Sequence, residues 1–252
     1  MAWQCSGSTN TELIRNMYQS GIITNTRVMN AMLKVDREHY APSRPYEDAP
    51  QPIGWGATIS APHMHASAAE ALVPFLRQGA RVLDIGSGSG YLTAVLAELV
   101  LDQKNDNYTN DSDDKNIAQT KIVGVEHMVQ LRDLGEKNFK KSNRGKELIS
   151  AGLVRFVLAD GRRGWHEDSQ NDASKASGWD AIHVGAAAKE LHEELIDQLK
   201  CPGRLFIPVE DSKTKGQWIW QVDKGLDGSL TKVRREPVRY VPLTEAPFTT
   251  NI

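Results

Sequence analysis

The chain has 252 residues, of which 40% are hydrophobic and 25% are charged. This length can bury one sizeable core, so we expect a single domain over residues 1–252. The 30 basic and 32 acidic residues leave a net charge of −2, so no overall positive field would gather nucleic acid or an anionic membrane. No apolar run is long enough for a membrane span and no N-terminal leader is readable, so we expect a cytoplasmic protein, in the cytosol and also the nucleus.

The first third of the chain predicts helices followed by a loop. Apolar residues recur at helical spacing over 9–33 on both sides of Gly21, which predicts two short helices that cover one edge of a sheet. Residues 36–61 are rich in Pro, Tyr and Gly and predict a loop with one short strand. A helix is expected over 65–76. His63 and His65 are placed in an extended segment, and with only two distant cysteines in the chain we expect no metal.

Residues 82–93 are the most informative segment. An apolar strand leads through Asp84 and three glycines, Gly86, Gly88 and Gly90, into a helical pattern. Glycine permits positive φ and lets a ligand approach the backbone, and the helix that follows begins with free N–H groups. A P-loop would need a Lys-Ser/Thr pair after its last glycine, whereas Tyr91 comes next here. The segment therefore predicts a nucleotide-type binding loop that is not an ATP phosphate cradle.

Two more carboxylates stand at the ends of predicted strands. Glu126 ends the strand 121–126, where a doubly wound fold places the acid that binds ribose hydroxyls. Asp160 follows the strand 154–159, and its carboxylate is a candidate to accept a hydrogen bond from an adenine amino group. The spacing from Gly86 to Glu126 is long, because residues 102–119 are polar and predict a flexible inserted loop. A glycine turn or an Asp-Gly pair alone is often only a packing feature, but the three acids together favour a bound ligand.

The C-terminal part predicts a sheet with a changed strand direction. Residues 167–177 are polar and predict a loop, and strands are expected over 179–184 and 204–209. Between them a helix is expected over 190–199, ended by Pro202 and Gly203. Residues 217–222 and 232–240 predict an antiparallel pair. The fold class is therefore α/β, with a doubly wound, mostly parallel sheet and an antiparallel C-terminal end.

These residues resemble the protein-L-isoaspartate (D-aspartate) O-methyltransferase family over nearly the whole chain. The resembling stretches are 48–54, 58–66, 83–90, 180–188 and 240–244, and the run Thr-Ile-Ser-Ala-Pro-His-Met-His at 58–65 is the most specific. The resemblance implies a class I, Rossmann-like methyltransferase that uses S-adenosylmethionine and releases S-adenosylhomocysteine. It implies methyl transfer to the free α-carboxylate of L-isoaspartyl, and also D-aspartyl, residues of damaged proteins. The protein is expected to be a monomer. Its N-terminal helices and substrate-binding loop would lie within residues 1–76, and its cofactor-binding sheet and C-terminal strands within 77–252.

The resemblance also assigns site residues. Ser60 matches the active-site serine, and His65 matches a histidine on the cofactor side. The isoaspartyl peptide would lie against the Ser60 loop and the segment 240–243. The full expectation for the cofactor is Ala57, Thr58, Ile59, Ser60, His65, Asp84, Gly86, Ser87, Gly88, Ser89, Glu126, His127, Asp160, Gly161 and Thr244, and for the substrate Ser60, Val241, Pro242 and Leu243.

Three departures from the family pattern accompany these assignments. The family's polar tail, with a glutamine near the cofactor, is replaced here by 245–249 and a chain end at Ile252. The usual Pro-Gly-Gly is Cys201-Pro202-Gly203, and the 102–119 loop is longer than usual. The first departure removes the tail contact with the cofactor that the family pattern would imply, whereas the other two do not touch the presumed reaction.

Methyl transfer to a carboxylate needs no general base, because a carboxyl group with a pKa near ~4 is already ionised at neutral pH. We therefore expect Ser60 to donate a hydrogen bond that orients the acceptor, rather than to act as a nucleophile. A Ser-His-Asp triad with His63 or His65 is the rival mechanism, but no Gly-x-Ser-x-Gly motif supports it. Two other functions stay open: methylation of another substrate, such as a nucleic-acid base or a small molecule, and an inactive cofactor-binding adaptor that recognises peptides.

Overall fold

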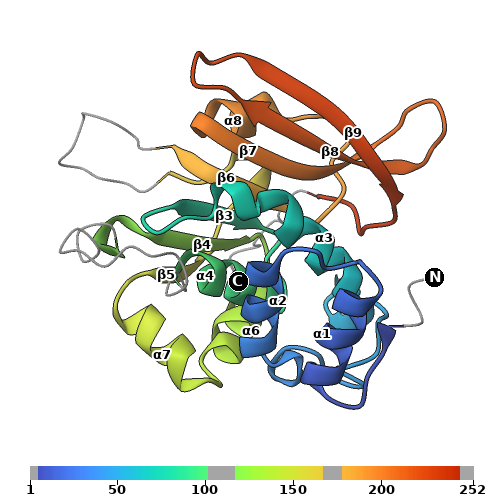
Figure 1. The fold of residues 1–252 in the computed structure, drawn as a ribbon. Coiled ribbons are helices and arrows are strands. Elements are labelled where there is room, and N and C mark those ends of the chain that lie inside the picture. The colour runs from blue at the N-terminus through green and yellow to red at the C-terminus, as the bar shows by residue number, and fades with distance from the viewer. Residues whose placement is uncertain (1–4, 102–116, 167–177, 245–252) are drawn as a thin grey trace, which may run out of the picture.

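The computed structural model describes residues 5–101, 117–166 and 178–244. A seven-stranded sheet with the order β5-β4-β3-β6-β7-β8-β9 organises these residues (Figure 1). The predicted loop 167–177 and the departing tail 245–249 lie outside the described residues, as does most of the predicted loop 102–119, whose last residues, 117–119, are helical. The strands are β3 (Arg81–Ile85), β4 (Lys121–Glu126), β5 (Val154–Leu158), β6 (Trp179–Val184), β7 (Leu199–Glu210), β8 (Gln217–Lys224) and β9 (Leu230–Val238).

The sheet is parallel at one side and antiparallel at the other. Strands β5, β4, β3, β6 and β7 run parallel, and β8 and β9 follow as antiparallel neighbours. The strand order turns back at β3, which lies between β4 and β6. Such a reversal opens a crevice at the carboxyl ends of the two strands, where open α/β sheets bind ligands. The predicted fold class and its antiparallel end are confirmed.

Alternate residues of the strands serve two different cores. Val82, Ile122 and Val154 belong to a core shared with most of the helices, whereas Leu83 and Val123 belong to a second core on the other face. This alternation follows from the two-residue period of a strand. The first core contains residues of α3 (Pro62–Leu72), α4 (Tyr91–Leu101), α6 (Val129–Phe139) and α7 (Asn143–Ser150), and the second contains those of α8 (Glu193–Asp197). Among the described helices, none is long and apolar enough to cross a bilayer.

The two N-terminal helices are α1 (Asn10–Gln19) and α2 (Thr26–Lys34), which confirms the predicted pair and its break at Gly21. Their predicted position was wrong, because α2 packs on α4 instead of covering an edge of the sheet. Residues 91–100 of α4 are all buried. A helix that is apolar on every side must be covered on every side, so α4 lies between the sheet and the N-terminal layer (Figure 1).

The segment 36–61 contains more regular structure than its composition predicted. After η2 (Arg37–His39), β1 (Gln51–Gly54) and β2 (Ala57–Ile59) form a hairpin, in place of the single strand expected. The next helix, α3, begins at Pro62 rather than at His65 and is continued by η3 (Val73–Phe75), because proline is well suited to the first turn of a helix. His63 and His65 therefore lie on a helix and not in an extended segment.

The predicted helix 190–199 was also wrong in length. Only α8 is helical, and β7 already begins at Leu199, so that Pro202 and Gly203 lie inside a strand. Pairing with both neighbours explains this, because Leu199 pairs with Trp179 of β6 and Gly203 with Lys224 of β8. The register between β6 and β7 shifts beside Pro202, which accommodates a residue that cannot donate to a ladder.

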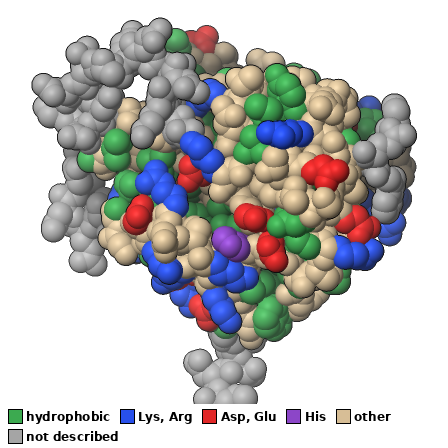
Figure 2. Space-filling model, turned by 60° about the horizontal axis from the view of Figure 1, so that its bottom comes forward, with side chains coloured by type: hydrophobic (Ala, Val, Ile, Leu, Met, Phe, Trp, Pro, Cys, Tyr) green, Lys and Arg blue, Asp and Glu red, His purple; other side chains and the backbone are tan. Residues whose placement is uncertain are grey.

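The last strand, β9, forms one edge of the described sheet. Most of its residues are exposed, and Lys232, Arg234 and Arg235 are among them. Elsewhere on the surface, Figure 2 shows a face on which basic and acidic side chains are interspersed, without a wide area of one charge.

Candidate functional site

The glycine loop joins β3 to α4 at the point where the strand order reverses. Gly86, Gly88 and Gly90 have φ values of +72°, +51° and +84°, which side chains with a Cβ rarely adopt. A Cβ at Gly90 would also lie 2.9 Å from the carbonyl oxygen of Gly135 on α6. On the other side of the crevice, a Cβ at Gly185 would lie 2.9 Å from the Gly86 oxygen. The loop is therefore built by close backbone contacts that only glycine allows.

Glu126 ends β4 beside this loop. Its Oε1 accepts from the Gly88 N–H at 2.8 Å, and its Oε2 accepts from the His127 N–H at 3.1 Å. Burial raises the pKa of Glu126 to about 7, although these two hydrogen bonds act in the opposite direction. A buried carboxylate at this strand end is the group that doubly wound folds place against ribose hydroxyls.

A cavity of about 60 Å³ opens at this edge of the sheet, and we call it the switch-point cavity. The segment 241–244 forms one wall. It is held by Ala187, whose N–H donates to the Val241 carbonyl at 2.8 Å and whose carbonyl accepts from the Leu243 N–H at 2.7 Å. The lining residues that the sequence predicted are Ala57, Thr58, Gly86, Gly88, Glu126, His127, Gly161, Val241, Pro242, Leu243 and Thr244.

The remaining predicted residues are not among those that line this cavity. Asp84 is buried, its Oδ2 accepts from the Thr93 hydroxyl at 2.5 Å, and its Oδ1 lies 2.8 Å from His183 Nδ1. This carboxylate ties β3 to α4 and β6, so it supports the loop from within. Ile59 belongs to the core, whereas Ser87 is buried with an Oγ that has no hydrogen-bond partner among the described residues.

Asp160 and Ser89 are engaged with neighbouring groups. The Arg162 guanidinium binds the Asp160 carboxylate with an N–O distance of 2.7 Å, and hydrogen bonds from Arg162 lower the pKa of Asp160. Ser89 is buried, and its carbonyl accepts from Asn138 of α6. The assignments of these residues as cofactor ligands stay predictions.

Ser60 lies between β2 and α3, and a fully buried arginine holds its backbone. Arg37 Nη2 donates to the Ser60 carbonyl at 2.8 Å, and Arg37 Nη1 lies 3.3 Å from His65 Nδ1. The guanidinium carbon is also 5.0 Å from the centre of the Tyr91 ring at the start of α4. Burial, with the charge of Arg37, lowers the pKa of His65 well below its usual value, so the imidazole is neutral and accepts from Arg37. One side chain thus joins Ser60, His65 and the helix that follows the glycine loop.

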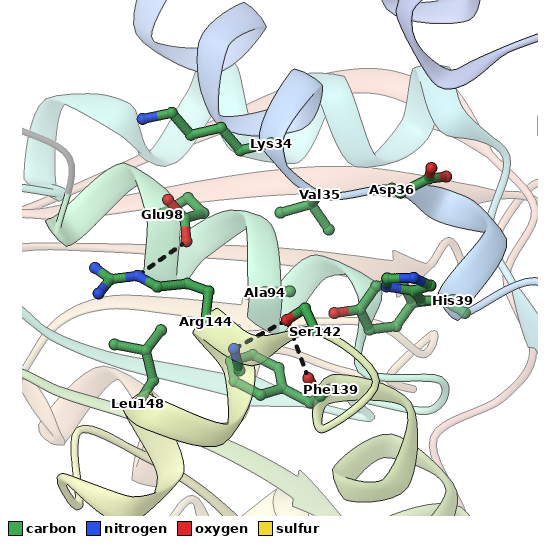
Figure 3. Close-up of a pocket in the computed structure, with 12 residues that line it drawn as sticks. Lys34, Val35, Asp36, His39, Ala94, Glu98, Phe139, Ser142, Arg144 and Leu148 are labelled. Atoms are coloured by element: carbon green, nitrogen blue, oxygen red, sulfur yellow. Dashed lines mark hydrogen bonds and ion pairs between the residues drawn. The ribbon is translucent and has the colours of Figure 1, made fainter.

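Two larger cavities also occur among the described residues, apart from the switch-point cavity. Neither is lined by the predicted cofactor residues, and one of them is lined by Tyr240 of the predicted substrate segment 240–243. The α3–β9 cavity has a volume of about 490 Å³ and is lined by Pro50, His63, Met64, Ser67, Phe206, Ile219, Glu236, Pro237, Val238, Arg239 and Tyr240. The α4–α7 cavity, of about 330 Å³, lies where α2, α4 and α7 approach one another (Figure 3). There Arg144 Nε lies 3.6 Å from Glu98 Oε1, which ties α7 to α4.

Comparisons with known proteins agree with this geometry. A family model described as protein-L-isoaspartate(D-aspartate) O-methyltransferase (PCMT) matches residues 8–247. The chain belongs to this family. A protein-L-isoaspartate O-methyltransferase of Caenorhabditis elegans is 44% identical over 97% of this chain and 96% of its own, and one of Triticum aestivum is 40% identical over 93% and 91%. A crystal structure of a family protein from Plasmodium falciparum, in complex with S-adenosyl-L-homocysteine, superposes with a TM-score of 0.79 at 32% identity, covering 95% of this chain and 100% of that one.

Within the family fold, the sequence did not reveal several groups that shape the site. Arg37 and Asp48 carried no catalytic pattern, and both are buried by contacts with residues distant in sequence. His183 stood inside an apolar strand, where nothing indicated its pairing with Asp84. Gly185 and Ala186 follow β6 and line the switch-point cavity. Two signals were available for them: their position at the carboxyl end of a parallel strand beside β3, and their place in the stretch 180–188 that resembles the family.

Proposed function

We propose that this protein transfers a methyl group from S-adenosylmethionine to the free α-carboxylate of L-isoaspartyl residues in damaged proteins and peptides. Family membership over residues 8–247 carries this proposal. The relatives at 44% and 40% identity bear the name of that activity, and the Plasmodium falciparum structure holds the demethylated cofactor. When the backbone nitrogen attacks the carbonyl, methanol leaves the methyl ester far more readily than water leaves the free acid. Methylation would therefore let the succinimide ring re-form, and part of it would reopen by hydrolysis to normal aspartate.

The residues at the switch point suit this cofactor chemically. Within the part of the chain that the structure describes, the Ser87 hydroxyl is buried without a hydrogen-bond partner, and the Glu126 carboxylate oxygens could accept hydrogen bonds from ribose hydroxyls. Gly86 and Gly88 leave room at the backbone where other residues would place a Cβ. The free volume of about 60 Å³ is below the several hundred Å³ of usual small-molecule sites, so the cavity would have to widen to admit a nucleoside. When bound, the sulfonium group supplies the activated methyl.

In the reaction itself the chain orients the acceptor. The acceptor carboxylate is ionised at neutral pH, so no base need remove a proton from it. The Ser60 hydroxyl is proposed to donate a hydrogen bond that directs one carboxylate oxygen towards the methyl carbon. Arg37 fixes the Ser60 carbonyl, which limits the positions of this hydroxyl. Alignment of two reacting groups can supply several kcal/mol of the barrier reduction.

The substrate is proposed to bind through its backbone along 241–243. The Val241 carbonyl and the Leu243 N–H already bond to Ala187, and Pro242 has no N–H. A peptide would therefore meet the other edge of this segment, where the Pro242 carbonyl can accept. Such backbone contacts would tolerate many different sequences around the damaged residue. A peptide panel with strict sequence requirements would contradict this mode of binding.

The deciding experiment compares two synthetic peptides that differ only in L-isoaspartate or L-aspartate at one position. We expect base-labile label from methyl-labelled S-adenosylmethionine on the isoaspartyl peptide alone. Label on neither peptide, with the cofactor still bound, would favour the adaptor. Label on a nucleic-acid base or a small molecule instead would favour the other methyltransferase function. Activity on D-aspartyl residues, the monomeric state, the cytoplasmic location and the absence of nucleic-acid or membrane partners stay predictions.

The pKa of Glu126 predicts a pH dependence of cofactor binding. As the pH falls below about 7, the carboxyl group of the free protein gains a proton and accepts more weakly from the ribose hydroxyls. Between about pH 8 and pH 6 the ionised fraction falls about tenfold, so we expect the Kd for S-adenosylmethionine to rise by up to about tenfold. Isothermal titration calorimetry measures this directly. In Glu126→Gln the Kd should be higher at pH 8 and nearly constant with pH, whereas His127→Asn should keep the pH step.

A further inference from the structure

The α3–β9 cavity has no part in the methyl transfer described above. It is open, about 490 Å³ in volume, and its walls are largely apolar, with Met64, Phe206, Ile219 and Val238 among the lining residues. An apolar hollow of this size is large enough for a side chain of a bound peptide. Five of its eleven lining residues carry polar groups (Ser67, Glu236, Arg239, Tyr240 and His63), and one of these groups is held in place by a buried carboxylate.

That group is His63, in the first turn of α3. Its Nδ1 lies 2.8 Å from Asp48 Oδ1, and the same oxygen accepts from the His63 N–H at 3.0 Å. The Asp48 side chain is fully buried, whereas 32% of the His63 side chain is exposed. Because the carboxylate holds Nδ1, Nε2 is the ring nitrogen left for a ligand. A buried carboxylate that orients a partly exposed imidazole is an arrangement that fixes a hydrogen-bonding atom at a surface.

The cavity is lined in part by the proposed substrate segment. Tyr240 lines the α3–β9 cavity, and the next residue, Val241, lines the switch-point cavity. On the other side, Thr58 lines the switch-point cavity and His63 lines the α3–β9 cavity, with Ser60 between them in the chain. A peptide that presents its isoaspartyl carboxylate near Ser60 would therefore place a neighbouring residue at the mouth of the α3–β9 cavity.

We propose that the α3–β9 cavity is a substrate subsite that takes an apolar side chain adjacent to the isoaspartyl residue, and that His63, held by Asp48, accepts a peptide N–H at its mouth. The inference rests on the proposed function. It gives the enzyme a preference among damaged peptides without a strict sequence, since the backbone contacts stay general and one flanking side chain gains apolar burial. An acidic flanking side chain would be disfavoured, because it would lose water on entering an apolar site.

The test uses isoaspartyl peptides that carry Leu, Ser or Asp immediately before or immediately after the isoaspartate. For the unmodified enzyme we expect KM to be about tenfold lower with Leu than with Ser at one of these positions, with kcat unchanged. Ser67→Phe should fill the cavity and abolish this preference while leaving the KM for S-adenosylmethionine intact. Ser67→Ala is the matched control, because it also removes the hydrogen bond from Ser67 to Glu236 but fills nothing. Ser67→Leu replaces the Phe variant if that variant does not fold.

The proposed role of His63 is tested by a separate variant. His63→Phe should raise KM for all peptides of the panel by a similar factor, because it removes a backbone contact and not a side-chain preference. Equal KM values for the Leu and Ser peptides, or a preference that survives filling at Ser67, would overturn the subsite. An unchanged KM in His63→Phe would overturn the role of His63. Absence of methylation of every peptide would instead reject the proposed function.

Discussion

Ser60→Ala is expected to lower kcat for an isoaspartyl peptide by about 10- to 100-fold, while the Kd for S-adenosylmethionine stays within about twofold. The range follows from the roughly 1.5–3 kcal/mol that a hydrogen bond to a charged group contributes. The loss should appear in kcat because the hydroxyl is proposed to align a carboxylate that the peptide backbone already holds in place. Initial rates of methyl transfer at saturating cofactor, over a range of peptide concentrations, separate kcat from KM.

Two variants test the interpretation of that result. Ser60→Thr keeps a hydroxyl and should recover part of the activity, and Ser150→Ala, at an exposed position at the end of α7, should behave as the unmodified enzyme. Full activity of Ser60→Ala would remove the serine from the mechanism. A complete loss, together with a covalent adduct on Ser60 in the unmodified enzyme, would support the rival nucleophilic mechanism.

Arg37→Met is expected to lower the free energy of unfolding by about 2–3 kcal/mol and the melting temperature by about 5–10 °C. The guanidinium is fully buried, and it contacts the Ser60 carbonyl, His65 and the Tyr91 ring. Burial lowers the pKa of Arg37 to about 10, so the group remains charged at neutral pH. Methionine has a similar volume and removes a buried charge, which offsets part of the loss of these contacts.

The same variant should lose activity even where it is folded. Without Arg37 the Ser60 carbonyl loses its donor, so we expect kcat/KM to fall about tenfold at a temperature well below the transition. Arg37→Lys keeps the charge but not the forked geometry and should be intermediate. The matched control is Arg44→Met, because Arg44 is 75% exposed and pairs only with the nearby Glu47 in the described residues. Thermal unfolding and activity like those of the unmodified enzyme in Arg37→Met would contradict the role of this residue.

The parts of the site that could be predicted are those fixed by local pattern and by sheet topology. Parallel strands end at one edge, so the glycine loop and Glu126 could be placed together once their strands were recognised. Arg37 could not be predicted, because an arginine in a loop is ordinarily exposed and its burial depends on Tyr91, which is distant in sequence. For the same reason, the Asp48–His63 pair becomes evident only when β1 and α3 are in place.

The errors of the sequence prediction have a common physical origin. Over 190–199 the apolar spacing suits a helix, yet strand pairing on two sides takes Leu199 and the residues after it into β7. The two N-terminal helices and their break at Gly21 were predicted but placed at the wrong surface, because α2 packs on the apolar helix α4 and not on a sheet edge. In both cases the local sequence was compatible with more than one arrangement, and tertiary contacts determined which one formed.

The charged edge of the sheet has a consequence for an enzyme that handles damaged chains. Partly unfolded proteins expose strands that seek unpaired backbone groups, and an open edge is a template for their aggregation. Lys232, Arg234 and Arg235 on β9 oppose such pairing, since an incoming strand would strip water from these cations. A substrate can thus bind at the cavities beside α3 and the carboxyl ends of the strands, while the charged stretch from Lys232 to Arg235 keeps other strands from pairing with the edge of β9.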